Sequence, residues 1–413
     1  METVRDGAAD RTVMPLSLSQ REVWLDQRAW PDSTHLIIGG ALFLDGPLQL
    51  DLLRRSLGAL VAESDALRLV PHADGNQSLL AAFDAELEVV DLDPQVNLRE
   101  AVRSWWDRRM DDTFAWDVAP PWNFGLLRQG PDRHVIMIQF HHLVMDGWGT
   151  SHVMQRWSDI YNAMQAGQGL PSTDDPGYVS FIEESNAYRD SAAFERDAQY
   201  WLAQIPQLPE PMVARRHAAV HDGQLPVARL GRESVLRADY DRLKQLAVDR
   251  NSTAFNYFLA ALVLYFSRVE QRRNVVIGVP SLNRGGRRYR ATLGMFVGVV
   301  PVSVNLTPDM TCEGLLAAVG LAMRGALRHP RYPLSELIRA LEMMRQGQDN
   351  LFDVLLSFER QDYDCSFGAA RLTESRQLFS GRARYPLSVT VCEFLPDQDL
   401  ELVLEGSSAC FDD

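Results

Sequence analysis

The chain has 413 residues, 46% of them hydrophobic and 23% charged, a composition typical of folded globular proteins and not of disordered tails or fibres. Its 41 basic and 55 acidic residues give a net charge of −14, which argues against a nucleic-acid partner and against docking on an anionic membrane. The length predicts two or three structural units.

The sequence gives no indication of a signal peptide at its N-terminus or of a membrane helix. The N-terminal residues include acids and no apolar core of a signal peptide, and no apolar run reaches the ~18 residues of a membrane helix. The four cysteines are scattered without CxxC spacing. We therefore expect reduced thiols in a cytoplasmic protein.

Strand-like and helix-like segments alternate, which predicts an α/β fold. In the first half we expect a strand at 36–44, a helix carrying Leu53, Leu57, Leu60 and Val61, a helix at 99–110, and a strand at 135–140. The last of these is almost continuously apolar, which favours a strand covered on both faces. In the second half we expect helices at 194–205 and 252–267 and strands at 274–279, 351–358, 385–394 and 400–404. The stretch at 165–176, rich in glycine, proline and small polar residues, predicts a boundary between units at 14–170 and 177–413.

The segment FHHLVMDGWG, residues 140–149, follows the apolar strand and offers the best candidate site. It allows several interpretations. The histidines can be ordinary packed residues beside an Asp-Gly turn. A metal site formed by His142 and Asp146 is disfavoured, because adjacent histidines point to opposite faces of a strand and no further ligand cluster is present. Acid–base chemistry by one histidine fits its pKa near neutrality. A serine triad is weak, since no GxSxG elbow occurs.

HHLVMDG resembles the HHxxxDG signature of condensation domains of nonribosomal peptide synthetases. Six further segments resemble the other motifs of that family in the family's own order, and they cover nearly the whole chain. They lie at residues 15–27, 63–70 (with Arg68 in the arginine position), 178–184, 294–301, 329–337 and 382–389. The chain is thus identified as a member of this family by resemblance.

The resemblance implies two chloramphenicol-acetyltransferase-like lobes, which form a V-shaped pseudodimer with a central tunnel. The predicted units at 14–170 and 177–413 would be these lobes. It also implies a monomeric acyltransferase that joins an acyl thioester to an aminoacyl thioester as an amide. Both substrates would arrive on phosphopantetheine, carried by coenzyme A or a carrier protein, and the domain itself would bind no cofactor or metal.

The resemblance also assigns roles to residues of the motif. His142 would be the active-site histidine, and Gly147 the glycine whose backbone lies beside the reacting thioester. Asp146 and Arg284 would form a structural ion pair, and His141 would shape the loop. Four more residues would line the tunnel, although packing is the alternative for the large ones: Trp148, Met295, Phe296 and Gly298.

Two features resemble starter condensation domains, which attach an acyl group to the first amino acid. Gly298 stands where the fifth motif usually has asparagine, and the first motif and Ile37–Gly40 are similar to that subtype. Only about a dozen residues precede the first motif, which predicts a donor arriving in trans as acyl-CoA or on an acyl carrier protein. The acceptor would sit on a downstream peptidyl carrier protein beside an adenylation domain. The family's final helix is missing after Phe411, which predicts a piece of a larger synthetase.

Other functions of the same fold remain as alternatives. Elongation-type peptide condensation, an ester-forming acyltransferase and a non-catalytic recruitment domain are each compatible with parts of the sequence. A cyclisation domain is disfavoured because aspartates would replace the histidines, and an epimerisation domain because its additional acidic motif is absent.

Overall fold

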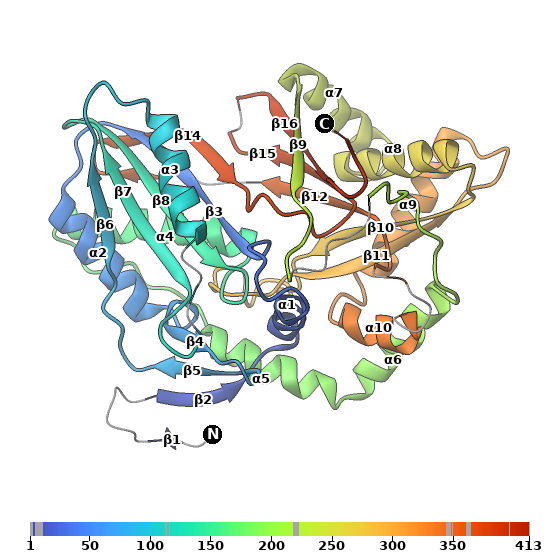
Figure 1. Ribbon diagram of the computed structural model, residues 1–413, viewed down its shortest axis with the longest axis horizontal. Coiled ribbons are helices and arrows are strands. Elements are labelled where there is room, and N and C mark those ends of the chain that lie inside the picture. Colours follow the sequence, from blue (N-terminus) through green and yellow to red (C-terminus); the bar gives the residue numbers. More distant parts are fainter. Residues whose placement is uncertain are drawn as a thin grey trace.

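The computed structural model describes residues 3–4, 11–111, 114, 116–217, 223–343, 348, 350–360, 365–395 and 397–412. Within these ranges the strands form two six-stranded sheets and one four-stranded sheet. Figure 1 shows the two large sheets on opposite sides of helix α1 (Leu18–Ala29), with the small sheet below the first of them. The predicted α/β fold is confirmed.

The first large sheet belongs mainly to the N-terminal half. Its strand order is β13 (Ser366–Phe367), β14 (Ala370–Leu378), β3 (Ile37–Asp45), β8 (Arg133–His141), β7 (Trp122–Arg128) and β6 (Leu87–Asp91). The strand β8 is buried on both faces, as its apolar run predicted: Ile136 and Ile138 face one core cluster, while Val135 and Met137 face another. Helices α2 (Leu50–Glu63) and α4 (Gly147–Gln165) contribute to the first cluster and α3 (Leu98–Asp111) to the second.

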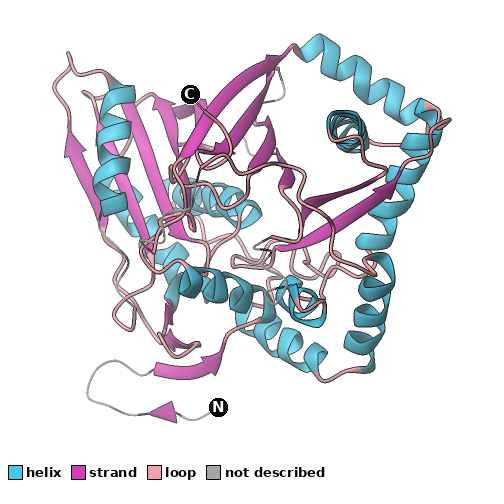
Figure 2. Ribbon diagram, turned by 45° about the vertical axis from the view of Figure 1, so that its right-hand side comes forward, coloured by secondary structure: helices cyan, strands magenta, loops and turns pink. Residues whose placement is uncertain are grey.

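The second large sheet lies in the C-terminal half. Its strand order is β11 (Gly298–Asn305), β10 (Asn274–Ser281), β12 (Val354–Arg360), β15 (Leu387–Glu393), β16 (Leu400–Ser407) and β9 (Ala228–Val235). One face packs into a separate core cluster with α8 (Ala254–Val269) and α9 (Cys312–Ala326). Figure 2 shows helices along the outer side of this half, so the opposite face of its sheet points toward the other half.

The remaining elements complete the two halves and the connection between them. They are β1 (Thr3–Val4), β2 (Arg11–Pro15), η1 (Ala66–Arg68), β4 (Leu69–Pro71), β5 (Asn76–Leu80), α5 (Tyr178–Arg189), α6 (Ala192–Gln204), α7 (Arg237–Asp249) and α10 (Leu334–Ala340). The helix α1 begins at a capping box, in which the Ser17 hydroxyl accepts from the Gln20 N–H and the Gln20 side chain accepts from the Ser17 N–H.

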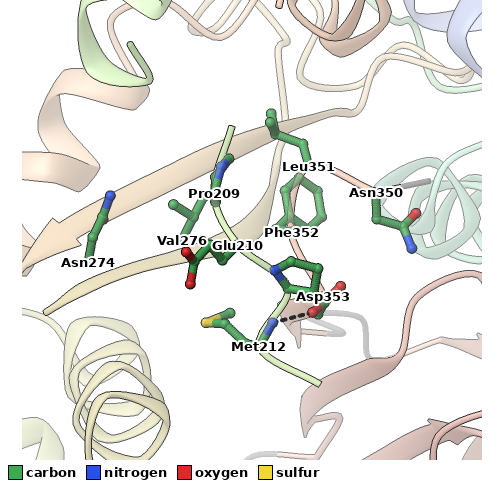
Figure 3. Close-up of a pocket in the computed structure, with 10 residues that line it drawn as sticks. Pro209, Glu210, Met212, Asn274, Val276, Asn350, Leu351, Phe352 and Asp353 are labelled. Atoms are coloured by element: carbon green, nitrogen blue, oxygen red, sulfur yellow. Dashed lines mark hydrogen bonds between the residues drawn. The ribbon is translucent and has the colours of Figure 1, made fainter. Parts of the chain in front are cut away.

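Each strand and helix expected from the pattern is present, with ends shifted by up to three residues. The strand expected at 351–358 begins at Val354, because the Asp353 carboxylate accepts hydrogen bonds from Met212 N–H (2.5 Å) and Val213 N–H (2.9 Å) and so binds an irregular segment. Figure 3 shows Leu351, Phe352 and Asp353 lining a small pocket against that segment.

The two halves are interlocked, since β13 and β14 come late in the chain but pair with the first sheet. Polar contacts also join them: the Arg384 guanidinium lies 2.7 Å from the Asp26 carboxylate of α1, and the Glu22 carboxylate accepts from the Ser335 N–H at 2.8 Å. The loop after β8 is therefore held between two halves that are tied to each other.

Candidate active site

The HHLVMDG loop connects the buried strand β8 to the helix α4. Its backbone is fixed at both ends, because His142 N–H donates to the Leu36 carbonyl at 2.7 Å and Asp146 N–H donates to the Gly294 carbonyl at 3.2 Å. Asp146 is also the N-cap of α4, where its carboxylate accepts from Gly149 N–H at 2.7 Å. These hydrogen bonds thus fix both the end of β8 and the start of α4.

His141 is buried and held by two hydrogen bonds. Its Nδ1 accepts from Leu143 N–H at 3.1 Å, so the neutral ring carries its proton on Nε2, which donates to the Gln27 side-chain oxygen at 3.0 Å. Burial, with a smaller contribution from His142, lowers the pKa of His141 to about 3. This histidine therefore stays neutral and shapes the loop from the interior.

His142, the next residue along the chain, is half-buried. Burial lowers its pKa, and the nearby Asp146 charge and the backbone of His142 and Met145 offset only part of this effect. Its Nδ1 is buried without a hydrogen-bond partner of acceptable geometry among the described atoms. At neutral pH the ring is thus a neutral imidazole that can accept a proton.

The Asp146 carboxylate, with 0% exposure, is the centre of a buried polar cluster. Its Oδ1 lies 2.7 Å from Arg284 Nη2, and its Oδ2 accepts from Phe296 N–H at 3.0 Å. Arg284, 5% exposed, also donates from Nη1 to the carbonyls of Tyr289 (3.0 Å) and Thr292 (2.6 Å). The structure therefore brings Asp146 and Arg284 together, and the pair attaches the start of α4 to the segment from 284 to 296.

Gly147, the first residue of α4, is exposed at the surface of the loop. Within the described chain no group accepts a hydrogen bond from its N–H, as is usual in the first turn of a helix. The partial positive charge of the helix N-terminus adds to this free donor. A developing negative charge beside Gly147 would be stabilised here.

The four candidate tunnel residues lie in different surroundings. Met295 and Phe296 are buried in the core of the first half, which favours packing, the alternative that the sequence left open. Trp148 is half-buried and donates from Nε1 to the Arg290 carbonyl at 2.9 Å. Gly298 is half-buried at the start of β11, opposite Ser281.

Glutamines that no sequence pattern predicted support the loop. Gln20 donates from Nε2 to the Leu143 carbonyl at 3.0 Å and forms a reciprocal amide pair with Gln77. Gln27, about two turns further along the same face of α1, accepts a hydrogen bond from His141. The only signal for Gln20 and Gln27 was their place in the first motif, while Gln77 gave none, because its partner is distant in sequence.

Glu359 was also missed, although its carboxylate lies beside Gly147: a Cβ placed on that glycine would be 3.0 Å from Glu359 Oε2. It comes from the inner face of β12 in the other half.

Within the described ranges no group of three or more His, Cys, Asp or Glu could hold a metal ion, and no helix is long and apolar enough to cross a membrane.

Comparison with known proteins shows the family of this chain. A model of the condensation domain family matches residues 10–413. The isonitrile lipopeptide synthase of Streptomyces coeruleorubidus is 26% identical over 369 residues, which are 88% of this chain and 25% of the relative. The dimodular nonribosomal peptide synthase of Bacillus subtilis (strain 168) is 24% identical over 368 residues, 87% of this chain and 15% of the relative. The chain thus spans a quarter or less of the length of these relatives.

Solved structures are similar over nearly the full chain. A variant of the starter condensation domain of rhizomide synthetase RzmA, in complex with C8-CoA, matches with a TM-score of 0.85 and 25% identity over 97% of this chain and 90% of that chain. The first condensation domain of the calcium-dependent antibiotic synthetase matches with a TM-score of 0.82 and 23% identity over 97% and 92%. The second likeness supports the fold alone.

Proposed function

Since this chain belongs to the condensation domain family, as its motifs predicted, we propose that it forms an amide bond between an acyl thioester and the amino group of an aminoacyl thioester. The observation that carries the proposal is the presence on one loop of a neutral imidazole, at the half-buried His142, and of the free N–H of Gly147. Proton transfer and oxyanion stabilisation are the two needs of this reaction.

The acceptor amine requires help with a proton. An α-amino group has a pKa of roughly 7.7–8.0, so part of it is already neutral at pH 7. When its nitrogen attacks the thioester carbonyl, the nitrogen becomes positive and must lose a proton. His142 is neutral and can accept that proton, then return one to the departing thiolate. Such general-base assistance contributes typically about 10²–10⁴-fold.

The carbonyl oxygen becomes negative in the same step. The Gly147 N–H, at the positive end of α4, would donate to this oxygen without any rearrangement of the loop. Asp146, Arg284 and His141 would act indirectly, by holding His142 and Gly147 at this spacing. Of the other candidates, Trp148 and Gly298 are half-buried and retain an exposed part for a tunnel, whereas Met295 and Phe296 would support its wall from the core.

The donor is proposed to be an acyl-CoA or an acyl carrier protein, as in starter condensation domains. The likeness to a starter domain in complex with C8-CoA and the glycine in place of asparagine at position 298 support this subtype. Phosphopantetheine would then come with the substrates, and the acceptor would be an aminoacyl peptidyl carrier protein next to an adenylation domain.

Two further properties belong to this proposal. The structure records no disulfide bond among the described residues, which suits a reducing cytoplasm. A monomer is expected because the two halves of one chain supply both sides of the site: His142 and Gly147 come from the first half and Arg284 from the second.

A direct assay tests the proposal. The domain is incubated with acyl-CoAs of increasing chain length and with a carrier protein loaded with an amino acid, and the acyl-aminoacyl carrier is detected by intact mass. We expect product from the wild type and at least 10²-fold less from His142→Ala. No product from the wild type with any donor, or equal product from the variant, would remove the assignment. Product only with a peptidyl carrier donor would favour elongation over the starter subtype.

A further inference from the structure

The inner face of the second sheet carries an acidic side chain close to the proposed site. Along β12, Val354 and Leu356 face the core of the C-terminal half, whereas Ser357 and Glu359 point to the opposite face. That face is directed toward the first half, because the Glu359 carboxylate reaches the start of α4. This carboxylate belongs to neither the Asp146 cluster nor the histidine pair.

The contacts of Glu359 leave one carboxylate oxygen available. Its Oε1 accepts a hydrogen bond from the Ser357 hydroxyl at 2.7 Å. Its Oε2 lies 3.0 Å from the position of a Cβ on Gly147, in the space directly above that exposed glycine. Among the described residues no lysine, arginine or histidine forms an ion pair with Glu359, unlike Asp146 with Arg284.

A half-buried carboxylate without a cationic partner is costly, since it loses water without gaining an opposite charge. Burial and the nearby charge of Asp146 both raise the pKa of Glu359. A cation bound in the space above Gly147 would offset both effects. The acceptor of the proposed reaction supplies one, because an α-amino group with a pKa of roughly 7.7–8.0 is mostly an ammonium at pH 7.

We propose that the Glu359 carboxylate binds the α-amino group of the acceptor aminoacyl thioester and positions it for attack. This inference rests on the proposed function. The ammonium would be received by a charge-assisted hydrogen bond to Oε2. After one proton has left to water, the same oxygen still accepts a hydrogen bond from the neutral amine, which directs the nitrogen lone pair toward a carbonyl beside Gly147.

A simpler role would be structural, with the negative charge of Glu359 favouring the positive N-terminus of α4. The two roles differ in what they do to ligands. A structural role affects all thioesters equally, whereas an amine-binding role distinguishes a thioester that carries the amino group from one that lacks it.

The experiment compares Glu359→Gln with wild type and with Glu401→Gln as a matched control. Across the sheet, Glu359 of β12 lies opposite Cys392 of β15, which lies opposite Glu401 of β16. Unlike Glu359, Glu401 forms an ion pair with Arg232. The probes are a small set of aminoacyl thioesters of N-acetylcysteamine and the same thioesters without the amino group. Dissociation constants are measured by calorimetry at pH 7, and acceptor KM and kcat in the condensation assay.

In the wild type and in Glu401→Gln we expect the amine-bearing probes to bind about tenfold tighter than their amine-free counterparts, the effect of one charge-assisted hydrogen bond. In Glu359→Gln the difference should vanish and the acceptor KM should rise, with the donor KM unchanged. Glu359→Asp, which keeps the charge, should retain part of the preference. Thermal unfolding of each variant separates this result from a loss of fold.

Two results would overturn the inference: equal binding of both probe types by the wild type, or a preference that persists in Glu359→Gln. Failure of the proposed function looks different, because the wild type would then make no amide. The binding comparison needs no turnover and decides the role of Glu359 in either case.

Discussion

Replacing Asp146 by alanine should unfold the protein more easily and not only stop its chemistry. The side chain is fully buried and holds three partners together: the Arg284 guanidinium, the Gly149 N–H at the start of α4, and the Phe296 N–H. Alanine leaves the Arg284 charge buried at 5% exposure without a carboxylate, although two carbonyl oxygens and the Phe296 ring still contact it.

The size of the effect follows from these contacts. Removing one partner of a buried ion pair costs about 3–5 kcal/mol, and loss of the N-cap alone about 1 kcal/mol. Because the carboxylate serves both purposes, the two costs overlap and we expect a decrease of about 3–5 kcal/mol in the free energy of unfolding. Urea unfolding at pH 7, followed by tryptophan fluorescence, measures it.

Two further variants test the reasoning. Asp146→Asn keeps an oxygen for the N-cap but not the charge, so it should lose less stability than alanine. Asp146→Leu combined with Arg284→Met removes both charges and should be more stable than Asp146→Ala. Two results would contradict this prediction: a stability of Asp146→Ala within about 1 kcal/mol of the wild type, or a double variant that is less stable than Asp146→Ala. Full condensation activity in a well-folded Asp146→Ala would equally refute it.

Three other outcomes are expected. The pKa of His141 is lowered to about 3 in the folded state and is ordinary in the unfolded state, so unfolding takes up a proton below pH 6.5. Stability should thus decrease by about 2 kcal/mol between pH 6.5 and pH 5, and His141→Gln should reduce this slope in urea unfolding; an unchanged slope would contradict the assignment. Gly294→Ala should lower the melting temperature strongly, because Gly294 has φ +148° and a Cβ would lie 2.2 Å from the Tyr178 ring; a shift of less than about 2 °C would be inconsistent with this contact. Gly147→Ala should have a melting temperature close to that of the wild type, because only the movable end of the Glu359 side chain must shift. The variant should nevertheless lose condensation activity, because the added methyl group occupies the proposed thioester space. Retained activity would place the thioester elsewhere.

The sequence by itself determined the secondary structure and the place of the motif. The apolar run of β8 predicted a strand covered on both faces, and the sheet places Ile136 and Met137 in two different clusters. The pattern that failed was local too: the strand predicted from Leu351 starts three residues later, because the Asp353 carboxylate binds the backbone of a distant segment.

Only the tertiary structure decided which side chains meet the motif. No pattern in the sequence placed Glu359 of β12 above Gly147, and none paired Gln20 with Gln77 or Gln27 with His141. Periodicity reports which face of one element is apolar, since that depends on neighbours a few residues apart. Polar contacts between two halves depend on how separate sheets pack, and that packing is set by cores assembled from the whole chain.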